Sequence, residues 1–459
     1  MFKKIDATCL LRKIFFYLIL VSLFAGGVAL ILKVGGPLSA HSAHAAIQPA
    51  TSYSAFEGLN HSPALILLRL LIIIPSALGF GFLFKKLGQP SVMGEMVAGI
   101  LIGPSFLGWI FPDFFHFVFP SASLGYLQIL SQIGILFFMF IVGMEMDLPA
   151  LKKEIHSAVV ISHSSMMAPF LLGMVLALYL FKSCAPAGIS FPEFSLFMGI
   201  AMSITAFPVL ARIVREKGLA GTRLGTMALT CAAVEDVTAW SLLAVIVAIA
   251  QSASLSAALN TVSLTLGFAA AMIFIVKPFL ARFPQNRSRL SFLLLMSGSA
   301  WITEQIGIHG LFGAFLAGVI VPKDLSLRNF LSEPLEKISV FLMPIFFALT
   351  GLRMHGELLS WSGGSLRVFF LILAVAVAGK FGGSFFAARF SRMSVKDSAV
   401  IGILMNTRGL MELVVLNLGY DMGILSNEIF TLMVLMTLVT TLAAGPLLQG
   451  LERFRTKNI

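Results

Sequence analysis

The feature that most constrains this chain is the recurrence of long apolar stretches along nearly its whole length. A helix needs about 20 apolar residues to cross the hydrocarbon core of a bilayer, and the stretches are close to that length. The composition agrees, since 58% of the 459 residues are hydrophobic and only 12% are charged. A soluble domain carries about twice that charged fraction. The sequence therefore predicts an all-α polytopic membrane protein.

The first apolar run, residues 14–32, follows four basic residues and precedes the small-residue stretch SAHSAHAA. A secretory signal that ends at Ala43-His44-Ala45 and an uncleaved first helix both fit this pattern, and the sequence leaves the choice open. Residues 1–64 are thus a signal or an extra transmembrane helix plus an external loop. About thirteen core transmembrane helices are predicted to follow, and we number these spans one to thirteen. They cover residues 65–84, 91–110, 125–146, 156–181, 192–213, 224–250, 257–278, 290–306, 309–322, 338–353, 367–388, 398–419 and 427–451.

The basic residues of the connecting loops alternate along the chain. Loops rich in Lys and Arg follow the odd-numbered spans, whereas the opposite loops hold little more than Lys33, Lys182, Arg353 and Arg367. The positive-inside rule predicts that the loops rich in Lys and Arg are cytoplasmic, so that span one starts outside and the C-terminus lies inside. The net charge of +11 is therefore a topology signal, and no nucleic-acid partner is expected.

Two pairs of stretches indicate an internal repeat. GEMVAGILIGP (residues 94–104) resembles GAFLAGVIVP (313–322), and LFFMFIVGM (136–144) resembles IFFALTGL (345–352). The loop charges predict that the partners cross in opposite directions, which is the inverted repeat of many secondary transporters. The predicted parts are a first repeat at 65–250, a connector helix at 251–289, a second repeat at 290–452 and a short cytoplasmic tail at 453–459.

The repeat pairs span five with span twelve, and polar or helix-disrupting residues interrupt both. Span five contains MSITAFPV (residues 202–209) and span twelve contains MNTRGLMEL (405–413). Broken helices at corresponding places in two halves indicate a substrate site, because freed carbonyls and half-helix ends can coordinate ions. A pair of plain kinks, with the Ser and Thr side chains bonded to their own backbone, is the alternative. The polar residues are Ser203 and Thr205 in the first break and Asn406, Thr407 and Arg408 in the second.

Span six carries two adjacent acids, Glu235 and Asp236, near the middle of an apolar run. A charge at that depth costs roughly 2.5 kcal/mol or more, so the acids need a cavity, a counter-charge, a cation or a proton. A proton and an alkali cation would compete for the same carboxylate. The pair therefore predicts an exchange site with Asp236 as the main group. For Glu235 a packing role is the alternative.

Seven stretches, in order between residues 65 and 452, resemble the monovalent cation:proton antiporter-2 family, the sodium/hydrogen or potassium/hydrogen exchangers. The resemblance implies an NhaA-like inverted-repeat antiporter fold with two crossed broken helices, a homodimer, and elevator-type alternating access. Spans four to six and eleven to thirteen would form the moving core and the other spans the scaffold. The stretches are GQPSVMGEMVAGILIGPSFLG, GILFFMFIVGMEMDL, SITAFPVLARI, AAVEDVTAW, TEQIGIHGLFGAFLAGVIVPK, AGKFGGSFFAARF and NTRGLMELVVLNLG.

The resemblance also implies roles for single residues. Asp236 matches the essential carboxylate that binds cation or proton, and Glu235 stands where relatives commonly have Asp, Asn or Gln. Lys380 in span eleven matches the basic residue that faces the acids, and Ser203 and Thr205 match the polar positions of the first broken helix. A plain salt bridge is the alternative for Lys380.

Other polar residues in the spans are expected to support the structure. Arg408 and Glu412 are four residues apart in span twelve, so they are predicted to pair on one helix face. With Asn406 and Thr407 they would hold the broken helix in shape. Arg69, near the outer end of span one, is expected to extend its charged group toward the membrane surface.

The residues together predict a secondary active transporter in a bacterial inner membrane that exchanges Na⁺ or K⁺ for protons and uses no cofactor. A gated, channel-like K⁺ efflux pathway on the same scaffold is the alternative, and coupled proton flux separates the two. An organic-anion symporter gives no reason for an acidic pair with a lysine. An enzyme is excluded, since the chain has neither a nucleophile–base constellation nor a metal-ligand cluster.

Two properties stay open at this stage. Selectivity between Na⁺ and K⁺ depends on cavity size and ligand distances, which these residues do not determine. The stoichiometry depends on Lys380. Two protons per cation are expected if cation binding displaces the lysine from the acid, and one if the lysine stays charged throughout.

Overall fold

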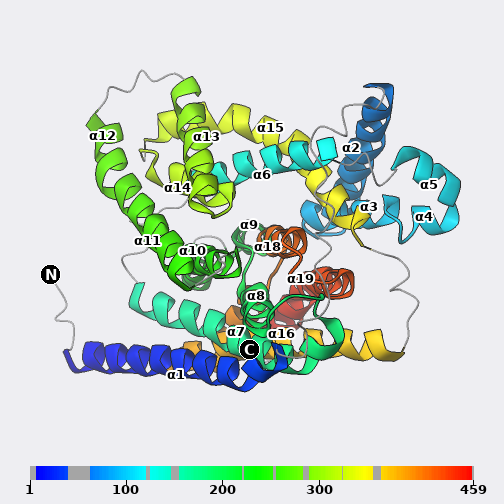
Figure 1. Cartoon of the computed structure of the whole chain (residues 1–459). Helices are drawn as coiled ribbons and strands as arrows, with labels where there is room; N and C mark the ends of the chain where they lie inside the picture. Colours follow the sequence, from blue (N-terminus) through cyan, green and yellow to red (C-terminus); the bar gives the residue numbers. More distant parts are fainter. Residues whose placement is uncertain are drawn as a thin grey trace.

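The structure is a computed structural model that describes residues 7–39, 63–119, 125–145, 155–219, 222–251, 255–282, 289–322, 324–354 and 363–456. Every regular element in these ranges is a helix, as Figure 1 shows. The predicted all-α fold is therefore confirmed. The predicted signal end at Ala43-His44-Ala45 lies outside the described residues.

One or more helices lie at each of the thirteen predicted spans. In chain order the elements are α1 (Ala7–Ser39), α2 (Pro63–Lys86), α3 (Ser91–Ile102), α4 (Leu107–Ile110), α5 (Pro112–Val118), α6 (Gly125–Glu145), α7 (Ile155–Cys184), α8 (Phe191–Ser203), α9 (Phe207–Glu216), α10 (Arg223–Gln251), α11 (Leu255–Ala271), the π-helical η4 (Met272–Val276), α12 (Lys277–Arg282), α13 (Arg289–Ile306), α14 (Gly310–Ile320), α15 (Leu325–Leu352), α16 (Gly363–Phe390), α17 (Val395–Met405), α18 (Leu410–Asp421) and α19 (Asn427–Thr456).

Within the described ranges, ten helices are long and apolar enough to cross a membrane, or eleven if the bent pair α17–α18 forms one span. The protein is therefore an integral membrane protein. The count of thirteen core spans stays a prediction, because α14 and the halves α8 and α9 are each shorter than a bilayer is thick.

One predicted boundary is wrong. Span ten was expected to begin at residue 338, but α15 begins at Leu325 and continues through Pro334 and Pro344. The charged stretch before residue 338 resembles a loop in sequence. In the structure it forms helix, because Glu333 and Lys337 lie on an exposed face and pair at 2.9 Å across one turn.

The helices form two groups. The scaffold group contains α2, α3, α6 and α13–α15, in which α6 packs against α14 and α15, and α3 packs against α2 and α15. The core group contains α7–α10 and α16–α19, in which α7 packs against α8, α10 and α16. Figure 1 shows the scaffold group in the upper half of the view and most of the core group below it. The core group consists of the helices at predicted spans four to six and eleven to thirteen.

Helix α1 packs along the core group, against α7 and α8. The rings of Phe24 and Phe170 meet edge to face at 5.2 Å, and the Ser39 hydroxyl accepts a hydrogen bond of 2.8 Å from the backbone N–H of Phe191. Gly35 lies against the Phe191 ring, where a side chain would not fit. The first apolar run therefore makes specific contacts with the helices beside the predicted site.

Glycines allow the scaffold helices to touch backbone to backbone. A Cβ atom at Gly99 of α3 would lie 2.4 Å from the Phe347 carbonyl oxygen of α15, and one at Gly318 of α14 would lie 2.1 Å from the Phe140 carbonyl oxygen of α6. These glycines come from the two similar stretches GEMVAGILIGP and GAFLAGVIVP. The matching contacts support the predicted inverted repeat, which stays a prediction.

The expectation for Arg69 is wrong. Its side chain is fully buried, and its guanidinium donates to the Val118 carbonyl and to the Tyr126 hydroxyl. A charged group inside a membrane protein is tolerated where protein acceptors replace water, and here α5 and α6 supply them. The residue holds scaffold helices together instead of reaching the surface.

We predict that Gly318→Ala destabilises the protein, because the new methyl group forces α14 and α6 apart. Overpacking of this kind costs about 1–3 kcal/mol. Gly298→Ala in α13 is the matched control, since a Cβ there meets nothing within 4 Å. Thermal unfolding of the detergent-purified variants is the measurement. Equal melting temperatures for the two variants would contradict the packing argument.

Candidate functional site

The two acids of the predicted site lie halfway along α10 and are almost completely buried. Glu235 and Asp236 are each 1% exposed. A buried carboxylate is costly unless charge or hydrogen bonds compensate it. The neighbours of these two side chains therefore decide what each acid can do.

Lys380 of α16 compensates Glu235. Its Nζ atom lies 2.8 Å from Glu235 Oε2, and neither side chain is more than 1% exposed. The same ammonium group donates a hydrogen bond to the backbone carbonyl of Ser203, at the end of α8. One cation thus ties three core helices together. The lysine faces the acids as the resemblance implied, and it pairs with Glu235. A buried ion pair fits both a structural and a transport role, so the roles of Glu235 and Lys380 stay predictions.

Asp236 is placed differently. Within the described part of the chain, its Oδ2 atom has no hydrogen-bond partner, and neither has Oε1 of Glu235. Asn406, at the second break, is 9% exposed and leaves its side-chain oxygen without a partner as well. A buried carboxylate oxygen of this kind can take up a proton or a cation, and an amide oxygen can coordinate a cation.

The first break separates α8 from α9 at residues 204–206. Helix α8 begins at a capping box, in which the Ser190 and Glu193 side chains bind each other's backbone N–H groups, and it ends at Ser203. The Ser203 hydroxyl donates to the Gly199 carbonyl of its own helix at 2.7 Å. This hydrogen bond is the one that the kink alternative expects. Ser203 reaches Lys380 through its backbone carbonyl and not through its side chain.

The second break separates α17 from α18 at residues 406–409. Thr407 folds back on its own helix, with its hydroxyl donating to the Leu404 carbonyl at 2.7 Å. Gly409 has a φ of 154°, which favours glycine. A Cβ there would also lie 3.0 Å from Val209 of the first broken helix. The chain therefore needs glycine at this turn.

The two breaks bind each other. Thr205 donates its hydroxyl hydrogen to the Met405 carbonyl at 2.8 Å, and the Ala206 N–H donates to the Thr407 carbonyl at 3.1 Å. Backbone groups released by one break are thus satisfied by the other, as a low-dielectric interior requires. The predicted pair of crossed broken helices is present in the structure.

Arg408 stabilises the crossing of the two broken helices through an ion pair and two backbone contacts. The predicted pair with Glu412 is present, with 2.8 Å between Nη1 and Oε1, and both side chains are fully buried. The guanidinium also donates to the Met202 carbonyl at 2.7 Å and to the Ala201 carbonyl at 3.3 Å, at the C-terminal end of α8. A cation there satisfies orphan carbonyls and complements the helix dipole. The sequence did not reveal this second set of contacts.

Thr441 of α19 is a further supporting residue that the sequence analysis missed. Its hydroxyl accepts from the Arg408 N–H at 2.9 Å and donates to the Arg408 carbonyl at 2.7 Å. The only signal in the sequence is a cluster of threonines in an otherwise apolar run, MTLVTTLAA. Such threonines commonly bond their own helix, so this signal is weak.

The chain resembles known proteins over most of its length. Residues 70–451 match the family described as sodium/hydrogen exchanger, transmembrane. The chain is 39% identical over 398 residues to the Na⁺/H⁺ antiporter NhaS4 of Synechocystis, covering 83% of this chain and 96% of that protein. It is 33% identical over 386 residues to the K⁺/H⁺ antiporter 1 of Saccharomyces cerevisiae, covering 80% of this chain and 44% of that protein.

The fold has a solved counterpart. The sodium proton antiporter MjNhaP1 of Methanocaldococcus jannaschii superposes with a TM-score of 0.61 at 14% identity, covering 84% of this chain and 95% of that one. At that identity the likeness concerns the fold alone. The family match extends over most of the chain, and it includes both breaks and the acidic pair. The chain therefore belongs to the transmembrane sodium/hydrogen exchanger family.

Proposed function

We propose that the protein is a secondary antiporter that exchanges a monovalent cation, Na⁺ or K⁺, for protons across a membrane. The observation that carries the proposal is the unequal pairing of charges at the crossing. Glu235 is bound to Lys380, Glu412 is bound to Arg408, and Asp236 has no basic partner within 4 Å among the described residues. Asp236 is therefore the acid left to hold the transported ion.

The charge count supports a single exchanged charge. The crossing buries three acids, Glu235, Asp236 and Glu412, and two bases, Lys380 and Arg408. With all five ionised, the site has one surplus negative charge. One proton or one monovalent cation on Asp236 balances it, whereas both together would leave a positive charge in a low-dielectric interior. Competition between proton and cation for one carboxylate is the coupling step.

The rigidity of the crossing supports alternating access by movement of a whole helix group. The mutual hydrogen bonds of the breaks and the contacts of Arg408 hold α8, α17 and α18 together. Lys380 joins α10 to this unit through Glu235 and the Ser203 carbonyl. Reshaping that unit would expose unpaired backbone groups to hydrocarbon. We propose that the core group instead moves as a body against the scaffold group, an elevator-type cycle. The names of the relatives, a Na⁺/H⁺ and a K⁺/H⁺ antiporter, support antiport and leave both cations as candidates.

We also propose that the protein works as a homodimer held through the scaffold group, as the family resemblance implies, in a bacterial inner membrane with the C-terminus cytoplasmic. The ten apolar helices support the membrane location. The alternation of basic loops supports the orientation.

Asp236→Asn is expected to abolish cation-driven proton flux, since an amide neither releases a proton nor supplies a negative charge. The measurement is proton movement in proteoliposomes after addition of Na⁺, K⁺ or Li⁺, with Glu333→Gln, an exposed acid on α15, as the control. Retained exchange in Asp236→Asn would refute the mechanism. Cation current without proton flux in the unmodified protein would instead indicate a channel.

Lys380→Gln is expected to destabilise the protein by about 3–5 kcal/mol, because it leaves Glu235 as a buried charge without its partner. The double variant Glu235→Gln/Lys380→Gln should recover most of that loss, since two amides remain compatible with one another. Melting temperature measures the stability, and proton flux in the double variant measures the role of the pair in transport. A double variant as unstable as Lys380→Gln would contradict the pairing.

One proton per cation is expected, because the buried Lys380–Glu235 pair stays intact while Asp236 exchanges its ligand. Exchange in proteoliposomes should then be unaffected by an imposed membrane potential. Transport that reverses or accelerates with the potential would contradict this stoichiometry and would support two protons per cation.

A further inference from the structure

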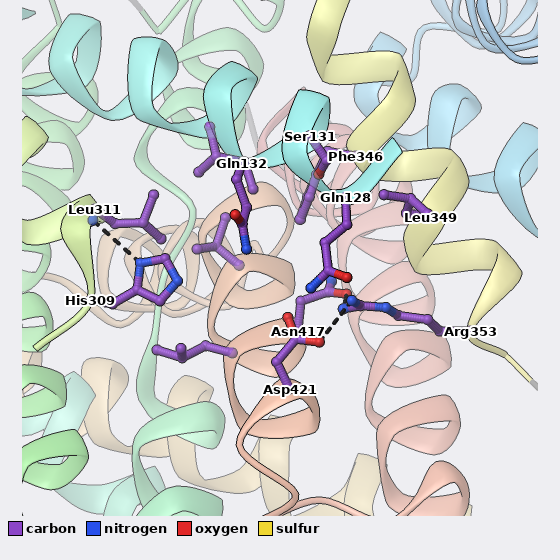
Figure 2. Close-up of a pocket in the computed structure, with 13 residues that line it drawn as sticks. Gln128, Ser131, Gln132, His309, Leu311, Phe346, Leu349, Arg353, Asn417 and Asp421 are labelled. Carbon is purple, nitrogen blue, oxygen red and sulfur yellow. Dashed lines mark hydrogen bonds and ion pairs between the residues drawn. The ribbon is translucent and has the colours of Figure 1, made fainter. Parts of the chain in front are cut away.

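A pocket lies between the scaffold and core groups, beside the crossing. Helices α6 and α15 form one wall, and α18 and the start of α14 form the other. Figure 2 shows Gln128 and Gln132 extending from α6 toward the side of α18 that carries Asn417 and Asp421. The pocket lies at the ends of α15 and α18 that the loop charges predict to be external.

The α6 wall is a polar stripe in an apolar helix. Gln128, Ser131 and Gln132 are spaced at three and four residues, so they share one helix face. All three line the pocket, and Gln132 is also an exposed residue. Polar side chains at membrane depth are tolerated where they face water or polar partners. The stripe therefore indicates that water reaches this face.

The lining of the pocket extends toward the crossing. Val414 of α18 and Ile135 of α6 also line it, one turn deeper than the polar residues. Val414 is four residues from Leu410, the residue at which α18 begins after the second break. Four helical residues rise about 6 Å. An apolar layer about one helical turn thick thus separates the pocket from the crossing.

A polar clamp joins the two groups at the mouth of the pocket. Arg353, at the end of α15, lies 2.7 Å from Asp421 Oδ1 and donates to Asn417 Oδ1 at 2.6 Å. Asn417 in turn donates to the Thr350 hydroxyl at 2.9 Å. Each of these bonds joins scaffold helix α15 to core helix α18. Side-chain exposures of 17% for Arg353 and 37% for Asp421 place the ion pair in contact with solvent.

We propose that this pocket is the outer aqueous mouth of the exchange path, which admits hydrated monovalent cations, and that the Arg353 clamp holds it closed. The inference rests on the proposed antiport function. Bonds of 2.6 to 2.7 Å do not survive sliding of α18 along α15, so the clamp must release whenever the core group moves against the scaffold. Because the ion pair touches solvent, water replaces its partners at small cost.

Cysteine labelling tests the proposal without relying on transport. In a background with Cys9, Cys184 and Cys231 replaced by alanine, we introduce Gln132→Cys or Ser131→Cys. A charged, membrane-impermeant thiol reagent is then added to right-side-out and to inside-out vesicles. We expect Gln132→Cys to react from the predicted outer side only. Ser131, only 4% exposed, should react slowly while the clamp is closed.

Release of the clamp should then speed the labelling of Ser131→Cys. Arg353→Gln and the isosteric Asp421→Asn each remove a charged hydrogen bond, which shifts an opening equilibrium by about tenfold. The matched control is Lys337→Gln, which breaks the exposed Lys337–Glu333 pair of the same helix α15 and should leave the rate unchanged. Asp421→Asn keeps the side-chain shape, so it tests the clamp even if Arg353→Gln fails to fold.

Three results would overturn the proposal: no labelling of Gln132→Cys from either side, labelling only from the cytoplasmic side, or a Ser131→Cys rate that neither clamp variant changes. The antiport proposal is judged separately by proton flux in Asp236→Asn. Labelling as expected together with retained flux in that variant would support the mouth and refute the role of Asp236.

Discussion

The structure depends on one constraint, that backbone groups released inside a membrane must find partners in the protein. Two helices are interrupted at the centre of the core group, and neither could be stable there alone, since unpaired N–H and C=O groups in hydrocarbon cost several kcal/mol each. Each interruption supplies hydrogen-bond partners for backbone groups of the other. Ala206 and Thr205 donate to carbonyls of the second break, and Arg408 donates to carbonyls at the end of α8.

The same constraint explains how the charges are distributed. Each buried base at the crossing binds both a carboxylate and backbone carbonyls at the end of α8. Lys380 binds Glu235 and the Ser203 carbonyl. Arg408 binds Glu412 and the carbonyls of Ala201 and Met202. These two ion pairs are structural elements of the breaks. Asp236 is the acid that the arrangement leaves to an external ligand. Two of the three buried carboxylates at the crossing are thus paired with bases, and the proposed exchange role is assigned to the third, Asp236.

The contacts near Arg353, at one end of the interface between the two helix groups, differ in kind from the glycine contacts inside the scaffold group. Inside the scaffold group, glycines such as Gly99 and Gly318 bring backbones into direct contact, so the helices cannot slide past one another without a clash. At the end of the interface near Arg353, α15 meets α18 through side-chain hydrogen bonds beside a polar pocket. Hydrogen bonds that water can replace are suited to a contact that opens and closes, whereas interlocked backbones are suited to a fixed frame.

The sequence by itself determined the membrane class, the places of the spans, the two breaks, the acidic pair and the Arg408–Glu412 pair, because bilayer length and helical spacing are local rules. Only the tertiary structure decided which acid Lys380 neutralises, that Arg408 binds the end of α8, that Thr441 supports the second break, and that Arg69 is buried. The contacts of Lys380, Arg408 and Thr441 join residues that are separated by 33 to 207 positions in the sequence. No spacing rule reaches that far, since such partners are chosen by how the helices pack.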